Sequence, residues 1–210
     1  MEKIKFLNYK FLIMRIAHII TGLGNGGAEL SLNKICSYDK LNEHYVISLT
    51  NLGKHGHLLK KKNIKVYYLE IKKNLFILNK FFKLISLLKK IKPDLIQTWM
   101  FHSDFLGSLA TLFYKKKIIW NIRNSNIGNS NKLTYVIIKL LSLFSWFFPE
   151  KIIVCSKHSI KNYEKLGYCK KKFSYIPNGY DLSDLKPITK INKIRKKYKI
   201  SRSIPLIGTV

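Results

Sequence analysis

The chain has 210 residues, of which 47% are apolar and 24% are charged, a composition that excludes a disordered protein and suits one full globular domain with part of another. Its 39 Lys and Arg residues outnumber its 11 Asp and Glu residues, which gives a net charge of +28. This charge either attracts nucleic acid, anionic lipid or phosphorylated substrates, or belongs to side chains that are simply solvated at the surface. The three cysteines lack a CxxC spacing, which fits a reduced, cytoplasmic compartment.

Residues 1–13 form a short basic extension. They combine lysines with an apolar run, but they contain no small-residue cleavage site and are too short to span a bilayer. We therefore predict no signal peptide here and place the start of the domain at Met14.

Apolar, β-branched runs alternate with segments whose apolar residues recur at helical spacing, which predicts an α/β fold with a parallel sheet flanked by crossover helices. The predicted strands are Arg15–Thr21, Tyr45–Thr50, Lys65–Leu69, Leu95–Trp99, Ile118–Ile122 and Lys151–Cys155. The predicted helices are Ala28–Ser37, Phe76–Ile91, Ser103–Tyr114, Lys132–Phe148 and Ser156–Leu166, with Ser103 and Ser156 as candidate N-caps.

The sequence changes in character after Gly167. Pro177, Asn178 and Gly179 indicate a turn, and Pro187 indicates a break. We therefore assign residues 14–186 to one domain. Residues 187–210 are expected to form an interdomain segment with a short basic helix, followed by the first strand of a second, truncated domain.

Ligands of an open parallel sheet bind beyond the carboxyl ends of the strands. The first predicted strand ends in a glycine-rich loop, which exposes backbone N–H groups to an anion at the start of a helix. The later strands end in an imidazole, a guanidinium and small polar groups, so the edge has the chemistry of an anion and sugar site. The residues at this edge are Gly22, Gly24, Gly26, Gly27, His102, Arg123, Asn124 and Ser156.

Each of these residues also has a simpler interpretation. The glycines alone are compatible with a tight turn, His102 with a buried polar side chain, and Arg123 with a salt bridge. Glu29 lies in the first turn of the first helix, where it either contacts a ligand or merely offsets the helix dipole.

The spacing of Gly22, Gly24 and Gly27 also satisfies GxGxxG, the signature of dinucleotide binding. That interpretation requires a carboxylate at the end of the second strand, where the sequence has only Thr50 and Asn51. An NAD(P)-dependent oxidoreductase is therefore the weaker alternative, with Lys54 leaving an NADP version open.

Other chemistries find little support in the sequence. There is no DxD pair for a metal-bound nucleotide, no GxSxG elbow, no Walker loop and no RNA-binding signature. His55 and His57 form an isolated pair, which we interpret as loop residues. We therefore predict no metal site, no hydrolase and no nucleic-acid partner.

Five segments together resemble glycosyltransferase family 4, the retaining sugar transferases of the GT-B type: IAHIITGLGNGGAELSL, PDLIQTWMFHSDFLGSLA, IIWNIRNSN, IIVCSKHSIKNYEKLGY and YIPNGYDLSDLKP. The resemblance implies the Rossmann-like N-terminal, acceptor-side half of a two-domain enzyme. It places the Gly22–Gly27 loop near the donor phosphates, His102 near the transferred sugar, and Asn178–Asp181 at the hinge. The second half, with its paired glutamates and nucleotide pocket, lies outside this sequence.

The resemblance further implies a nucleotide-sugar donor, a glycan or lipid-linked acceptor, and no metal or other cofactor. Related sequences often serve surface polysaccharide or lipopolysaccharide assembly. A non-catalytic Rossmann-type binding module is the alternative for a chain that carries only this half.

Two segments have a composition suited to membranes. Residues 74–92 combine an apolar stripe with flanking lysines, so we predict peripheral docking on the anionic inner face of the cell membrane. The alternative is that the stripe covers one face of the sheet. Leu133–Phe148 is too short to span a bilayer and is expected to be a buried or interfacial helix.

Overall fold

The computed structural model describes residues 13–71, 77–124, 132–179, 192–201 and 203–206. The predicted N-terminal extension, apart from residue 13, therefore lies outside the described part, as do residues 74–76 of the predicted membrane segment, Asp181 of the predicted hinge, and residues 207–210 of the predicted last strand. The chain divides into two compact units, Met1–Asn178 and Gly179–Val210.

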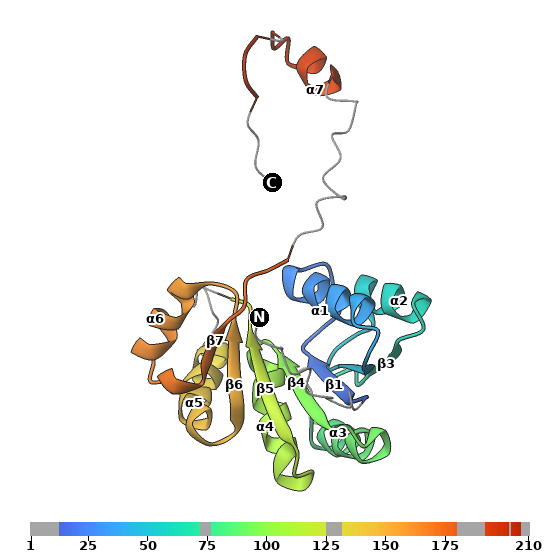
Figure 1. Cartoon of the computed structure of the whole chain (residues 1–210), viewed down its shortest axis with the longest axis vertical. Coiled ribbons are helices and arrows are strands. Elements are labelled where there is room, and N and C mark those ends of the chain that lie inside the picture. The colour runs from blue at the N-terminus through green and yellow to red at the C-terminus, as the bar shows by residue number, and fades with distance from the viewer. Residues whose placement is uncertain (1–12, 72–76, 125–131, 180–191, 202, 207–210) are drawn as a thin grey trace, which may run out of the picture. The chain divides into compact units, whose positions relative to one another are not determined.

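The first unit is built on a sheet in which every pair of neighbouring strands is parallel, with the order β3-β2-β1-β4-β5-β6-β7 (Figure 1). This sheet confirms the predicted α/β, Rossmann-like fold. The strands are β1 (Arg15–Ile20), β2 (Glu43–Ser48), β3 (Lys65–Tyr68), β4 (Leu95–Trp99), β5 (Lys117–Ile122), β6 (Pro149–Val154) and β7 (Phe173–Tyr175).

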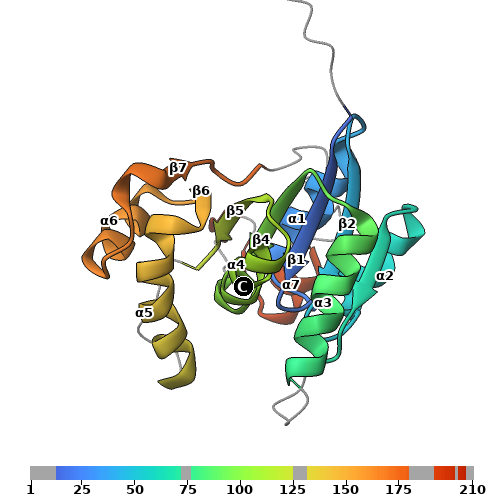
Figure 2. The ribbon, with the colours of Figure 1, turned by 90° about the horizontal axis from the view of Figure 1, so that it is seen from below.

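Helices connect the strands and bury apolar side chains against the sheet. Those at the β6–β7 end and those at the β1–β3 end lie far apart in both views (Figure 2). The helices are α1 (Gly27–Tyr38), α2 (Gly53–Lys61), α3 (Ile77–Ile91), α4 (Phe101–Phe113), α5 (Lys132–Phe147) and α6 (Lys157–Lys165), followed by a 3-10 turn at Lys170–Lys172.

Two apolar clusters show which helices cover which part of the sheet. Leu32 of α1 and Leu59 of α2 belong to the smaller cluster, together with Trp99 of β4. Leu84 of α3 and Ile138 of α5 belong to the larger cluster, which also contains the central strands. This burial is the main favourable term in the stability of the unit.

Helix α3 buries most of the apolar stripe that we predicted to dock on a membrane. Leu84, Ile85 and Leu88 are buried in the larger cluster, whereas Phe82 is 58% exposed. The stripe itself therefore packs as core. None of the described helices is both long enough and apolar enough to cross a membrane.

Three local predictions were wrong. Helix α2 was not predicted, so His55 and His57 lie in a helix and not in a loop. This helix begins at Gly53, whose φ of +52° and close approach to the backbone of Leu23 leave no room for a side chain. The short strand β7 was also missed, because it lies in the segment after Gly167 that we interpreted as a domain boundary, directly before the predicted turn at Pro177.

The third error concerns the start of α4. The helix begins at Phe101, so Ser103 is not its N-cap but lies buried in its first turn, where its Oγ is 3.2 Å from Oγ1 of Thr21. Ser156 does occupy the N-cap position of α6, but its side chain makes no capping hydrogen bond.

The second unit contains the helix α7 (Asn192–Lys197). It is shorter than the basic helix that the sequence predicted. Arg195 closes the turn after it, since its Nη1 donates to the carbonyl oxygens of Ser201 and Ile204 at 2.6 and 2.9 Å.

Asp104 of α4 is a buried acid whose replacement tests the electrostatics of the core. Its Oδ1 accepts a 2.6 Å hydrogen bond from Thr98 Oγ1, and Oδ2 has no partner among the described residues. Burial raises the pKa of Asp104 well above its ordinary value. The folded state therefore retains the proton that the unfolded chain loses above about pH 4.

We expect Asp104→Asn to raise the free energy of unfolding at pH 7 by about 1–2 kcal/mol. The gain should vanish below about pH 4, where the unfolded chain is protonated as well. Chemical denaturation at both pH values measures this, with the exposed Glu150→Gln as the control. Equal gains at pH 7 and pH 3.5 would contradict the protonated state of Asp104.

Candidate functional site

The strand order reverses direction between β1 and β4, and ligands of open α/β sheets bind at this switch point, beyond the carboxyl ends of the strands. The structure has a pocket of about 160 Å³ at this place. It combines residues that follow β1 and β4 with residues at the end of β5. Its lining consists of Thr21, Met100, Phe101, His102, Ile122, Arg123 and Asn124.

The glycine-rich loop joins β1 to α1 beside this pocket. Gly26 is the N-cap of α1 and no side chain caps the helix, so the first N–H groups of α1 point outward with the positive end of the helix dipole. A side chain at Gly22 would come within 2.9 Å of Thr50 Oγ1, whereas one at Gly27 would meet no atom within 4 Å. Gly22 is thus needed for packing, and Gly27 faces open space.

Glu29 folds back over this helix start. A Cβ atom at Gly26 would lie 2.5 Å from Oε2 of Glu29, and one at Gly24 would lie 4.0 Å from Oε1. The carboxylate therefore occupies the position where it offsets the helix dipole. An anionic ligand at the same amides would have to displace it.

His102 lies in the first turn of α4 and lines the pocket. Burial lowers its pKa below the ordinary histidine value, so the imidazole is neutral at pH 7 and can both donate and accept a hydrogen bond. The turn before it is strained, because Met100 has φ 72° and ψ 157°, a conformation that is almost restricted to glycine.

Arg123 supplies the positive charge of the pocket. Its Cζ lies 5.1 Å from the centre of the Trp99 ring, and its Nη1 donates a 2.7 Å hydrogen bond to Oδ1 of Asn178. The predicted alternative, a salt bridge, does not occur, because no carboxylate pairs with Arg123 within the described ranges. Its buried Nε has no partner there either.

The other predicted residues are distributed around this pocket. Asn124 lines it, and Asn178 reaches it through Arg123, whereas Ser156 begins α6 outside the lining. Gly179 belongs to the second unit.

The end of β2 does not offer a ribose site. No acidic residue stands between Ser48 and Gly53, and the hydroxyls there bond to backbone carbonyls. Ser48 Oγ donates to Asn51 at 2.6 Å, and Thr50 Oγ1 donates to Thr21 at 2.8 Å. The structure therefore adds no support for dinucleotide binding.

Four pocket residues were not predicted from the sequence: Thr21, Met100, Phe101 and Ile122. Thr21 ends the first predicted strand and Met100 follows the fourth, so their positions at the sheet edge could have been predicted from the sequence. The contact between Trp99 and Arg123 was not, because it depends on the pairing of β4 with β5.

The fold of this unit matches the Rossmann-like, N-terminal half of GT-B glycosyltransferases. The sequence model of Glycosyltransferase Family 4 matches residues 25–184. This match covers most of the chain, and the protein belongs to that family.

Individual relatives agree with this assignment. The capsular polysaccharide biosynthesis glycosyltransferase CapH of Staphylococcus aureus is 28% identical over 180 residues, which cover 82% of this chain and 49% of CapH. The crystal structure of Anabaena Alr3699/HepE in complex with UDP-glucose is 19% identical with a TM-score of 0.73, over 90% of this chain and 50% of that one. The lipopolysaccharide outer core galactosyltransferase WaaB is 17% identical with a TM-score of 0.58, over 80% and 46%.

The chain thus spans about half the length of the relatives it matches. The family match begins at Asn25, within the glycine-rich loop, and includes all of β4, β5 and β6.

Gly27→Ala tests whether the first amides of α1 approach a ligand. Alanine has free space here, so we expect folding to be stabilised by up to about 1 kcal/mol, while the affinity of the chain for inorganic pyrophosphate falls about tenfold because the methyl group occupies ligand space. Thermal unfolding and calorimetry measure the two effects. Unchanged affinity would show that the glycine-rich loop does not contact the ligand. Gly26→Ala is less informative, because its side chain first meets Glu29.

Proposed function

We propose that this chain forms the acceptor-side half of an enzyme that transfers a sugar from a nucleotide-sugar donor to a hydroxyl of a glycan or lipid-linked acceptor, with retention of configuration. One observation supports this more than any other. The switch-point pocket joins a neutral imidazole, His102, to a cationic guanidinium, Arg123, beside the start of α1, whose amides an anion reaches by displacing the Glu29 carboxylate.

The chemistry of the transfer explains why these groups suit the pocket. The bond between the anomeric carbon and the phosphate oxygen breaks while the acceptor hydroxyl oxygen bonds to the same face of that carbon. Negative charge develops on the nucleoside diphosphate that leaves, and a phosphate oxygen takes up the proton of the acceptor hydroxyl. Backbone N–H groups at a helix start and a fixed guanidinium stabilise such charge without reorganisation. No covalent intermediate or metal-bound step is needed from these residues.

His102 and Arg123 take different roles in this proposal. The neutral His102 hydrogen-bonds to a hydroxyl of the transferred sugar, as its position in the pocket beside Thr21 allows. Arg123 is held by the Trp99 ring and by Asn178, so its orientation is fixed before a phosphate arrives. The nucleoside is bound by the second half of the enzyme.

The proposed pathway is surface polysaccharide or lipopolysaccharide synthesis, at the cytoplasmic face of the membrane. CapH is named for capsular polysaccharide biosynthesis and WaaB for the lipopolysaccharide outer core. A non-catalytic binding module remains the alternative, because this chain spans only half of each relative.

Peripheral membrane contact is the second part of the proposal. Helices α3, α4 and α5 pack side by side, with Phe81 against Phe113 and Phe105 against Phe144. Their outer surface carries exposed apolar side chains, which suit an interface with lipid, and the lysines of α3 add attraction to anionic headgroups. The exposed apolar residues are Leu78, Phe82, Leu112, Phe113, Leu133, Val136, Leu140, Leu143 and Phe147.

His102→Ala tests the catalytic proposal in the complete two-domain enzyme. We expect turnover to fall at least about tenfold, because a hydrogen bond to the sugar is worth about 1.5 kcal/mol, while circular dichroism stays unchanged. Release of nucleoside diphosphate measures turnover, and NMR of the product shows whether the anomeric configuration is retained. The exposed His158→Ala serves as the control. An unaltered rate in His102→Ala would make His102 a structural residue, and a wild-type enzyme without transfer would favour the binding module.

The membrane surface is tested by reversing three exposed lysines of α3. Co-sedimentation of the chain with phosphatidylglycerol vesicles should rise with lipid charge and fall with salt. Lys83→Glu, Lys89→Glu and Lys90→Glu combined should weaken binding more than tenfold, at about 1 kcal/mol for each lysine. Reversing Lys54, Lys60 and Lys61 of α2 changes the net charge equally and serves as the control. Equal losses in both variants would point to non-specific attraction by net charge.

A further inference from the structure

A buried group of three side chains lies outside the pocket and takes no part in the proposed reaction. His18 of β1, Cys36 of α1 and His44 of β2 are 1%, 2% and 6% exposed. One nitrogen of each histidine and the sulfur of the cysteine all lie within 4.8 Å of one another. The pairing of β1 with β2 and the packing of α1 on both strands bring these residues together.

The two histidines face each other directly. Nε2 of His18 lies 2.9 Å from Nδ1 of His44, and the two rings are stacked with an interplanar angle of 25°. Without an ion, one of these nitrogens carries a proton and donates it to the other. Two imidazole nitrogens and a thiolate sulfur are the ligand set that Zn²⁺ prefers.

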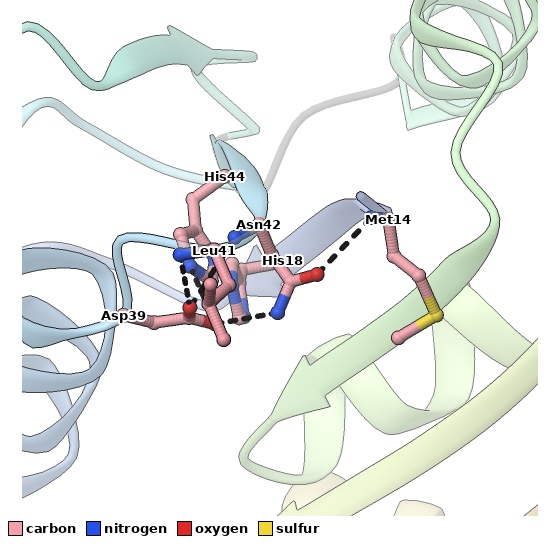
Figure 3. A network of polar contacts seen from close by, with 6 residues as sticks. All are labelled: Met14, His18, Asp39, Leu41, Asn42 and His44. Carbon is pink, nitrogen blue, oxygen red and sulfur yellow. Dashed lines mark hydrogen bonds and ion pairs between the residues drawn. The ribbon is translucent and has the colours of Figure 1, made fainter. Parts of the chain in front are cut away.

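A carboxylate supports the outer side of this group. Nε2 of His44 lies 3.2 Å from Oδ2 of Asp39. Asp39 is itself fixed by the backbone N–H groups of Leu41 and Asn42, at 3.0 and 3.3 Å, and by Asn42 Nδ2 at 2.8 Å (Figure 3). Metal-bound histidines commonly donate their outer N–H to such a carboxylate, which fixes the ring orientation.

The outer nitrogen of His18 also has neighbours. Gln97 of β4 pairs with His18 across the sheet. The indole Nε1 of Trp99 lies 3.4 Å from Nδ1 of His18 and is a donor only. Trp99 therefore favours the metal-free tautomer, with the proton on Nε2, and this proton must move to Nδ1 when an ion binds at Nε2.

We propose that His18 Nε2, His44 Nδ1 and Cys36 Sγ bind a zinc ion that stabilises the fold. When the ion enters, the Cys36 thiol loses its proton to solvent, the proton of His18 moves from Nε2 to Nδ1, and His44 keeps its proton on Nε2, facing Asp39. The two nitrogens must separate by about 0.4 Å to reach the spacing of a tetrahedral site. The thiolate leaves the ion with a net charge of +1, which Asp39 offsets.

The site has a route to solvent and a structural consequence. The Asp39 side chain is 27% exposed, so the ion and a water as its fourth ligand enter past this residue. Binding would tie α1 to β1 and β2 at the opposite end of α1 from Gly27. The ion is thus structural and takes no direct part in sugar transfer, and the site does not depend on the proposed function.

Cobalt is the probe for this site, because Co²⁺ bound to a thiolate absorbs in the near ultraviolet. The full chain is stripped with a chelator under reducing conditions and titrated with Co²⁺ and then with Zn²⁺. We expect one equivalent of Co²⁺ to bind with a sulfur charge-transfer band, Zn²⁺ to displace it, and the unfolding midpoint to rise. The absence of a stoichiometric band, or a band that only Cu⁺ displaces, would overturn the zinc assignment.

Variants locate the ion. Cys36→Ala should abolish the charge-transfer band, His44→Gln should prevent stoichiometric binding, and Asp39→Asn should weaken Zn²⁺ binding about 10- to 100-fold. Cys155→Ser and His57→Ala are the matched controls and should bind like the wild type. Circular dichroism of the stripped variants checks their folding, and Asp39→Asn provides the readout if a ligand variant is unfolded. Unaltered binding in Asp39→Asn together with a persistent band in Cys36→Ala would place the ion elsewhere.

Discussion

The parallel pairing of β1 with β4 is the constraint on which the site depends. It aligns Ile20 with Trp99, so that both strands end at the same level and the glycine-rich loop lies beside the start of α4. The helices that follow the two strands then begin on either side of one crevice. Only this pairing brings Thr21 and His102, which are far apart in sequence, into the same pocket.

Trp99 links the pocket to the buried part of the sheet. One contact of its ring is with Arg123, at 5.1 Å from Cζ, and its indole nitrogen lies 3.4 Å from His18. The guanidinium is thus supported by a side chain that is fully buried, which limits its motion without an acidic partner. A guanidinium held in this way, without a carboxylate partner among the described residues, is suited to a phosphate that arrives with its own charge.

Much of the fold was predictable, because buried parallel strands such as Ile118–Ile122 are mostly apolar runs that stand out in the sequence. Helix α2 was not, since its sequence GKHGHLLKK contains two glycines and two histidines, which are poor helix formers, and packing outweighs propensity there. The residues at the strand ends were predictable too, because each of them follows closely after a predicted strand. The bond between Arg123 and Asn178, and the meeting of His18 with His44, depend on strand pairing and could not be read from local sequence.

The central claim is that the switch-point pocket and the glycine-rich loop receive the diphosphate of a nucleotide sugar. Amide NMR of the full chain during titration with inorganic pyrophosphate, the group that all nucleoside-diphosphate sugars share, tests it most directly. The account predicts weak but saturable shifts at residues 22–28, at His102 and at Arg123, which persist at physiological salt. Shifts that spread over the surface lysines and vanish with salt, while these residues stay unchanged, would contradict it.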